Sequence, residues 1–203
     1  MSAVNAFYSN CDKLDNIPAI NKQNWLFELD LQCKLLPRDA TVLQVGSMDA
    51  TRIIEILKLR PDVNITGLEI EKDFIALAKG NLRKAGFDAG MIEADITKFQ
   101  SPIRYDYVTC LNNTLGYISD TEAAITHMKD AGNTVFVSVY GEAFDEKAAK
   151  EYFSSLGLQV EKAENDHFEL SDFGVVKRFT RDEIAAWSGK ITETPLGYFC
   201  ELK

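Results

Sequence analysis

The fold is decided by residues 41–50, which read TVLQVGSMDA. The first five form an apolar run typical of a buried strand, and Gly46 ends it in a turn. A helical stretch follows, with Ile53, Ile54 and Leu57 on one face. A strand, a glycine turn and a helix in this order begin a βαβ unit, which binds ligands at the carboxyl end of its strand.

Two later strands end close to acidic residues. Residues 65–69 read ITGLE and finish on Glu69, and a third strand leads to Asp95. A carboxylate at the tip of the second strand can accept hydrogen bonds from both hydroxyls of a ribose. The spacing therefore predicts a site for a small cofactor that contains a nucleoside.

Strands and helices alternate from residue 41 onward. Strands are expected at 42–45, 65–69, 89–94, 105–111 and 134–139, with helices between them. This alternation predicts a doubly wound α/β fold with a mostly parallel sheet covered on both faces. Because the crossovers are right-handed, the carboxyl ends of the strands meet at one edge of the sheet, where ligands bind.

The first forty residues are expected to form a helical lead-in. Polar cap candidates occupy residues 21–24, and apolar residues from Trp25 to Leu36 mostly keep helical spacing. Residues 37–39, Pro-Arg-Asp, are expected to end the helix.

The C-terminal part departs from the alternation. Residues 158–162, 167–170 and 174–179 look extended and suggest a hairpin, and 198–202 supply a last strand. Residues 119–122 and 180–183 each match a capping box that opens a helix.

The length of 203 residues predicts a single domain. We divide it into the lead-in at 1–40, a cofactor-binding core at 41–157, and a hairpin, helix and last strand at 158–203.

Charge and composition exclude several classes of function. The net charge of −9 disfavours nucleic acid as a partner, since phosphate binding needs a basic face. No apolar run is long enough to span a bilayer and no signal peptide is visible, so a cytoplasmic protein is expected. The four cysteines are scattered, and His127 and His167 complete no metal-ligand spacing. Cys110, inside an apolar strand, is expected to be a buried small hydrophobe.

From about residue 40 to its end the chain resembles the class I S-adenosylmethionine-dependent methyltransferases. The segments that carry the resemblance are 44–50 (QVGSMDA), 65–71 (ITGLEIE), 92–96 (IEADI), 105–108 (YDYV) and 112–117 (NNTLGY). The resemblance implies a Rossmann-like, seven-stranded sheet whose C-terminal strand is antiparallel. It also implies S-adenosylmethionine as the cofactor and S-adenosylhomocysteine as its product.

The first motif departs from the family pattern of acid-x-Gly-x-Gly-x-Gly. Gln44 replaces the acid, and Met48 and Ala50 replace two glycines, so that Gly46 alone keeps a position of close backbone approach.

At the adenosine end of the cofactor, the resemblance implies roles for four residues. Glu69 would bind the ribose hydroxyls and Ile70 would lie against the adenine face. Asp95 would accept from the adenine amino group, with the Ile96 amide near a ring nitrogen. Each acid also has a simpler interpretation as a loop residue with no ligand.

At the methionine end, Gly46 and Ser47 would present backbone amides to the carboxylate of the cofactor. Met48 could either crowd the pocket or rest against the cofactor, and Asn112 would lie beside the transferred methyl.

The candidate catalytic residues are Asn113, Tyr140 and His167. Asn113 could orient an amine or hydroxyl nucleophile, although asparagine more often caps a turn. His167 is the candidate general base, with a structural histidine as the alternative. His127 is expected to be structural, and Tyr8 in the lead-in could form a lid. Methyl transfer can rest largely on proximity, so the lack of a catalytic dyad does not argue against an enzyme.

We therefore predict methyl transfer from S-adenosylmethionine to an amine or hydroxyl of a small molecule. A non-catalytic binding or assembly subunit is the first alternative, since the glycine motif is degenerate. A synthase of the same fold that transfers an aminoalkyl group is the second, and a nucleic-acid or protein methyltransferase is less favoured. A nicotinamide-linked dehydrogenase is disfavoured because the turn lacks two glycines. The oligomeric state is not predicted.

Overall fold

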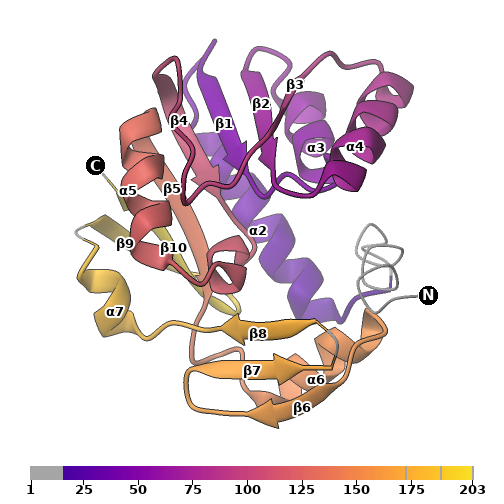
Figure 1. Cartoon of the computed structure of the whole chain (residues 1–203), viewed down its shortest axis with the longest axis vertical. Helices are drawn as coiled ribbons and strands as arrows, with labels where there is room; N and C mark the ends of the chain where they lie inside the picture. Colours follow the sequence, from indigo (N-terminus) through magenta and orange to yellow (C-terminus); the bar gives the residue numbers. More distant parts are fainter. Residues whose placement is uncertain (1–15, 172, 188, 203) are drawn as a thin grey trace.

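The computed structural model describes residues 16–171, 173–187 and 189–202. Its main feature is a seven-stranded sheet in the order β3-β2-β1-β4-β5-β10-β9 (Figure 1). The strands are β1 (Thr41–Val45), β2 (Asn64–Glu69), β3 (Gly90–Glu93), β4 (Tyr105–Cys110), β5 (Gly132–Tyr140), β9 (Gly189–Glu193) and β10 (Gly197–Leu202). The first five are parallel, and β10 runs antiparallel to both β5 and β9. The predicted doubly wound α/β fold is confirmed.

Helices cover both faces of this sheet (Figure 1). One face carries α2 (Ala19–Leu35), α3 (Thr51–Leu59) and α4 (Lys72–Ala85), and the other carries α5 (Thr121–Ala131) and α7 (Arg181–Ala185). Alternate side chains of β1 point to opposite faces of the sheet. Val42 packs toward α3, while Leu43 and Val45 pack toward α5.

The C-terminal segments form a second sheet. The strands β6 (Val160–Ala163), β7 (His167–Leu170) and β8 (Gly174–Lys177) are antiparallel and pair only with one another. They pack with α6 (Glu146–Ser155) on an aromatic cluster that includes Phe144, Phe153 and Phe168. The predicted extended segments are correct, but they make a separate three-stranded sheet below the main one (Figure 1). The seventh strand of the main sheet is β9, which the sequence did not predict.

Helix α2 differs from its prediction in where it begins and in what it buries. It starts at Ala19 behind Pro18, whose carbonyl accepts the amides of Asn21 and Lys22, so the cap candidates at 21–24 lie inside the helix. Its buried residues are Asn21, Asn24, Glu28, Leu29 and Gln32, whereas Leu26 is 48% exposed. The helix therefore turns a mainly polar face toward the sheet.

The two predicted capping boxes have different outcomes. The Thr180 hydroxyl and the Glu183 carboxylate exchange hydrogen bonds with each other's backbone amides at the start of α7, which confirms that box. At α5 the cap is Asp120, whose carboxylate accepts from the Ala123 amide, rather than Ser119. Tyr8 and Cys11 lie outside the described residues. Within the described ranges, no helix is long and apolar enough to cross a bilayer.

Candidate functional site

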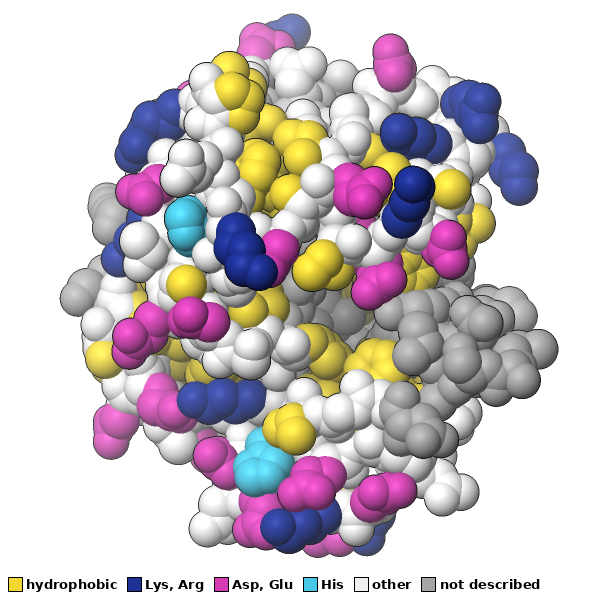
Figure 2. Space-filling model, in the orientation of Figure 1, with side chains coloured by type: hydrophobic (Ala, Val, Ile, Leu, Met, Phe, Trp, Pro, Cys, Tyr) yellow, Lys and Arg dark blue, Asp and Glu magenta, His cyan; other side chains and the backbone are white. Residues whose placement is uncertain are grey.

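A cavity of about 960 Å³ lies at the carboxyl ends of β1, β2 and β4. Figure 2 shows the molecule hollowed there, between the half that carries β1 to β3 and the half that carries β6 to β8. All eight predicted cofactor-binding residues line this cavity. They are Gly46, Ser47, Met48, Glu69, Ile70, Asp95, Ile96 and Asn112.

The loop after β1 keeps the backbone of a glycine motif with only one of its three glycines. The φ angles are 67° at Gly46, 47° at Met48 and 68° at Ala50. These are the three positions where the family pattern places glycine. A left-handed backbone costs a residue with a side chain about 1–2 kcal/mol. The loop conformation has therefore been retained although two of the three residues that favour it are absent.

Glycine itself is required only at the first of these positions. A Cβ on Gly46 would lie 2.4 Å from Thr114 Cγ2, in the 3-10 helix η1 (Thr114–Tyr117) that follows β4. The Thr114 side chain thus occupies the space that a side chain at position 46 would need.

Asp49 anchors the loop to the two helices beside it. Its carboxylate accepts the Thr51 amide at 3.0 Å and the Thr51 hydroxyl at 2.8 Å. The Asn81 side chain, on α4, donates to the Asp49 carbonyl at 3.1 Å. The sequence prediction did not include Asp49 or Asn81 among the site residues. An aspartate two residues before a threonine at the start of a helix is the signal that could have found Asp49.

The Glu69 carboxylate is held by three backbone amides. Oε2 accepts from Met48 at 2.8 Å, and Oε1 accepts from Ile70 at 2.9 Å and from Glu71 at 3.1 Å. Glu69 is only 6% exposed, and it lines the cavity. A carboxylate has about four lone-pair positions, so this network fixes the group and leaves it able to accept from a ligand.

The next strand supplies a second fixed acid. Asp95 Oδ1 accepts the Thr97 amide at 2.9 Å and its hydroxyl at 2.7 Å, and these bonds hold the pKa of Asp95 below its ordinary value. Oδ2 lies 3.4 Å from Lys98 Nζ, an exposed partner. Between the two acids, Ile70 presents an apolar side chain that is 58% exposed. The cavity edge at β2 and β3 therefore combines two ionised acceptors with an apolar surface.

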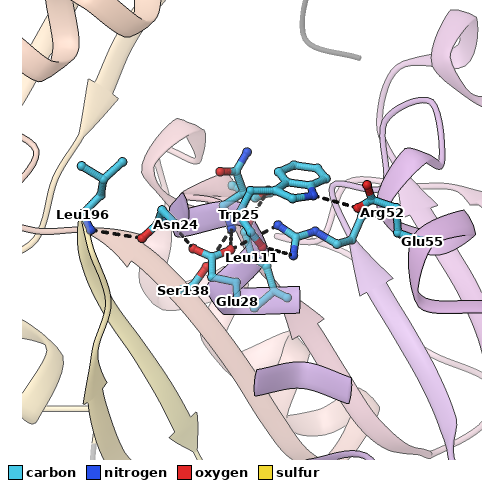
Figure 3. A network of polar contacts seen from close by, with 10 residues as sticks. Asn24, Trp25, Glu28, Arg52, Glu55, Leu111, Ser138 and Leu196 are labelled. Atoms are coloured by element: carbon cyan, nitrogen blue, oxygen red, sulfur yellow. Dashed lines mark hydrogen bonds and ion pairs between the residues drawn. The ribbon is translucent and has the colours of Figure 1, made fainter. Parts of the chain in front are cut away.

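A buried network joins α2 to the carboxyl ends of β4 and β5 (Figure 3). Glu28 Oε2 lies 3.4 Å from Arg52 Nη2 and accepts the Asn112 amide at 3.1 Å, while Oε1 accepts from Asn24 Nδ2 at 2.7 Å. The Asn112 amide also donates to Ser138 Oγ at 2.7 Å. Burial raises the pKa of the Glu28 carboxyl, and the Arg52 guanidinium opposes that shift. Asn112 is thus held by its backbone at the cavity wall.

Arg52 reaches the cavity beside Trp25. Its guanidinium lies 3.7 Å from the centre of the Trp25 ring, and the indole N–H donates to Glu55 at 2.7 Å. Both residues line the cavity, as does Asn21. The sequence prediction missed these three residues. The signal that could have revealed a polar face on this helix is the spacing of Asn21, Asn24, Glu28 and Gln32.

Three buried polar side chains in the cavity wall lack a hydrogen-bond partner in the described part of the chain. They are the amide of Asn21, the Oε1 of Gln44 and the hydroxyl of Ser47. Buried polar groups without partners are costly, and a bound ligand is one way to satisfy them.

The three candidate catalytic residues lie outside the cavity wall. Asn113 is fully buried; its Nδ2 donates to the Lys177 carbonyl at 3.1 Å and its Oδ1 accepts the Tyr140 amide at 3.0 Å. Tyr140 is buried and stacks on Phe144 at 3.9 Å, and burial raises its pKa well above the ordinary value. His167 lies on β7, with Nδ1 2.9 Å from the Asp166 carboxylate. In this geometry all three make structural contacts.

Among the described residues, no histidine or cysteine lines the cavity. His127 lies on α5, away from the cavity wall. Burial raises the pKa of Cys110 to about 12, which agrees with the small hydrophobe that was predicted. In the described ranges, no group of three or more His, Cys, Asp or Glu side chains could hold a metal ion.

Comparison with known proteins identifies the family. Residues 37–178 match the family model described as "Methyltransferase domain". A carboxy-S-adenosyl-L-methionine synthase from Campylobacter jejuni is 28% identical over 81 residues. That match covers 40% of this chain and about a third (32%) of the synthase.

Two solved structures show the same fold over nearly the whole chain. An S-adenosylmethionine-dependent methyltransferase from Clostridium acetobutylicum has a TM-score of 0.62 at 9% identity and covers 91% of each chain. CalS10, an amino pentose methyltransferase from Micromonospora echinaspora, has a TM-score of 0.61 at 18% identity, covering 87% of this chain and 90% of its own. The chain belongs to the methyltransferase-domain family and has the fold of S-adenosylmethionine-dependent methyltransferases.

Proposed function

We propose that the cavity binds S-adenosylmethionine and that the protein transfers its methyl group to an amine or hydroxyl of a small molecule. The observation that carries the proposal is the loop after β1, which keeps three left-handed positions and donates the Met48 amide to Glu69. A decayed site would have no reason to retain this strained backbone. The loop therefore supports a working cofactor site, and a methyl-transfer assay is what distinguishes an enzyme from a non-catalytic subunit.

The residues at β2 and β3 fit an adenosine group. Glu69 is fixed where it can accept from ribose hydroxyls, and Ile70 offers an apolar surface to a purine ring. Asp95 Oδ2, now beside the exposed Lys98, can accept from an exocyclic amino group.

The residues at the end of β1 fit an amino-acid group, which carries one ammonium and one carboxylate. Gln44 Oε1 is an unpartnered acceptor for the ammonium. The Asn21 amide and the Arg52 guanidinium supply donors for the carboxylate. Glu28 balances the charge of Arg52, so the pair adds no net charge at this end of the cavity.

When bound, S-adenosylmethionine supplies an electrophilic methyl on a sulfonium. The protein's part is then to hold the acceptor in line and to exclude water. The relatives support a small-molecule acceptor, since one solved structure of this fold is an amino pentose methyltransferase.

Calorimetric titration with S-adenosylmethionine and S-adenosylhomocysteine tests the proposal. We expect the wild type to bind at micromolar concentration. Glu69→Ala should weaken binding about a hundredfold, because it removes charge-assisted hydrogen bonds worth about 1.5–3 kcal/mol each. Glu93→Ala is the matched control, because Glu93 pairs with Glu69 at the same sheet edge but lies outside the cavity wall. No binding to the wild type at millimolar ligand, or equal losses in both variants, would refute the site.

A further inference from the structure

The cavity continues beyond the proposed cofactor residues to a second wall. This wall is built from η1, α6, β8 and the residues before α2, and it consists of Ile17, Tyr117, Tyr152, Phe173, Val175 and Lys177. The rings of Tyr117 and Phe173 meet edge to face at 5.9 Å, and Val175 is 57% exposed. A wall of rings and aliphatic side chains fits a planar, apolar molecule.

Lys177 is the cation of this wall. Its Nζ lies 2.8 Å from Glu183 Oε1 and 4.8 Å from the centre of the Phe179 ring. Glu183 is itself fixed, since its Oε2 accepts the Thr180 amide at 2.8 Å. An ammonium has three N–H donors, so the bond to Glu183 holds the group in place and leaves donors for a ligand.

The backbone of Lys177 is also fixed, close to the end of β4. Its carbonyl accepts from Asn113 Nδ2 at 3.1 Å. A Cβ on Gly116, in η1, would lie 2.4 Å from the same carbonyl. β8 therefore packs directly on η1, which places Lys177 beside the segment that carries Asn112 and Thr114 in the cavity wall.

Charges divide the cavity into two halves. The carboxylates that line it in the described chain are Asp49, Glu69, Glu71 and Asp95, all on the half built by β1 to β3. Of the lining residues that the structure describes, none is a histidine or a cysteine. The second wall therefore offers a cation and no evident base, which suits an acceptor that has already lost its proton.

Building on the proposed function, we propose that the methyl acceptor is a planar, apolar molecule with an oxygen that is ionised near neutral pH, a phenolate or carboxylate. The rings of the second wall hold its plane, and Lys177 holds the oxygen anion. An oxygen lone pair forms the new O–C bond while the C–S bond breaks and its electron pair stays on sulfur. Anion and sulfonium give two neutral products, and no proton has to move.

Small aromatic ligands of different charge test this proposal. We would titrate the protein loaded with S-adenosylhomocysteine with 4-nitrophenolate, 4-nitroaniline and benzylamine. We expect the phenolate to bind at least tenfold more tightly than either amine. Lys177→Met should remove that preference and leave the affinity for S-adenosylhomocysteine within twofold, whereas Lys190→Met, an exposed lysine on β9, should change neither.

The Glu183→Gln variant should change the phenolate affinity in the opposite direction to Lys177→Met. Glutamine can keep the capping box and removes the negative charge that competes with the phenolate for Lys177, so phenolate binding should strengthen. A purely structural Lys177–Glu183 pair would weaken binding in both variants. Equal binding of amine and phenolate, or no phenolate binding at millimolar concentration, would overturn the assignment of the acceptor. Failure of S-adenosylhomocysteine itself to bind would instead refute the proposed function.

Discussion

The two faces of the main sheet are stabilised in different ways. The face under α5 buries an apolar cluster that includes Leu43, Val108, Met128 and Val137. The face under α2 buries an ion pair, amides and hydroxyls, while Leu26 of α2 points to solvent. The second face has an apolar cluster of its own, which includes Val42, Ile53 and Ile56, and in addition it places polar groups at the edge of the ligand cavity.

The two faces also differ in how many buried polar atoms lack a hydrogen-bond partner in the described residues. A buried donor or acceptor without a partner costs about 1–3 kcal/mol. Both Asn21 and Gln44 carry such atoms in the cavity wall, and Gln32 and Thr109 carry them elsewhere on the α2 face. We infer that the α2 face is adapted to a bound ligand and the α5 face to stability of the empty protein.

The largest expected effect comes from the ion pair of the α2 face. Arg52→Met leaves the Glu28 carboxylate buried without its cation, so we expect the free energy of unfolding to fall by about 3–5 kcal/mol. Denaturant unfolding monitored by circular dichroism measures the loss.

The double variant Glu28→Gln/Arg52→Met is the control for that loss. Glutamine removes the charge and keeps one acceptor oxygen for Asn24, while the Asn112 amide still donates to Ser138 Oγ, so part of the lost stability should return. A loss below 1 kcal/mol in the single variant would show that the pair does not hold α2 to the sheet.

On the opposite face, Met128→Ala should cost about 2–3 kcal/mol. Met128 is fully buried on α5, and truncation creates a cavity that flexible neighbours fill only in part. The loss should be the same at pH 5 and pH 8, because the surrounding cluster is apolar. Unfolding curves at both pH values check this, and a marked pH dependence would contradict the contrast between the faces.

Trp25→Phe should have a smaller effect, about 1 kcal/mol. The variant keeps a ring over Arg52 but removes the indole N–H that donates to Glu55 at 2.7 Å. The midpoint of thermal unfolding measures the change. Glu55→Gln retains an acceptor and should cost less than Trp25→Phe; the reverse order would argue against this hydrogen bond.

The smallest effect is expected at the C-terminal end of α2. Arg60 donates to the carbonyls of Cys33 and Leu36, and its hydrogen bonds to Asp62 lower the pKa of that carboxyl from 3.8 to about 2. A carboxyl with a lowered pKa stabilises the fold above pH 3.8 and loses that contribution as the pH falls through 2. Asp62→Asn should therefore flatten the decline of the unfolding midpoint between pH 4 and pH 2. Equal slopes in the two proteins would exclude this role.

The α/β core could be predicted from the sequence because its pattern is local. The run at 41–45 alternates between the two faces of the sheet, and Gly86 and Gly157 end helices with φ of 79° and 81°. The cavity could be placed for the same reason, since Gly46, Glu69 and Asp95 each follow a strand.

The missed features depend on partners far away in the chain. The Asn24 side chain bonds the Leu196 amide, a partner 172 residues away, which no helical spacing reveals. β9 has little apolar sequence of its own and forms because it pairs with β10. The sequence left Asn113 either to orient a nucleophile or to cap a turn, and its amide bonds the Lys177 carbonyl on β8 and the Tyr140 amide.

The left-handed residues after β1 show that the backbone conformation of a motif can persist when its sequence changes. Met48 and Ala50 adopt dihedral angles that glycine usually adopts, so the residue types differ from the motif while the backbone geometry does not. A search for the three glycines alone would pass over this loop, and a search by backbone angles would retrieve it. Related chains that lack the glycine signature are therefore best sought by the shape of this turn.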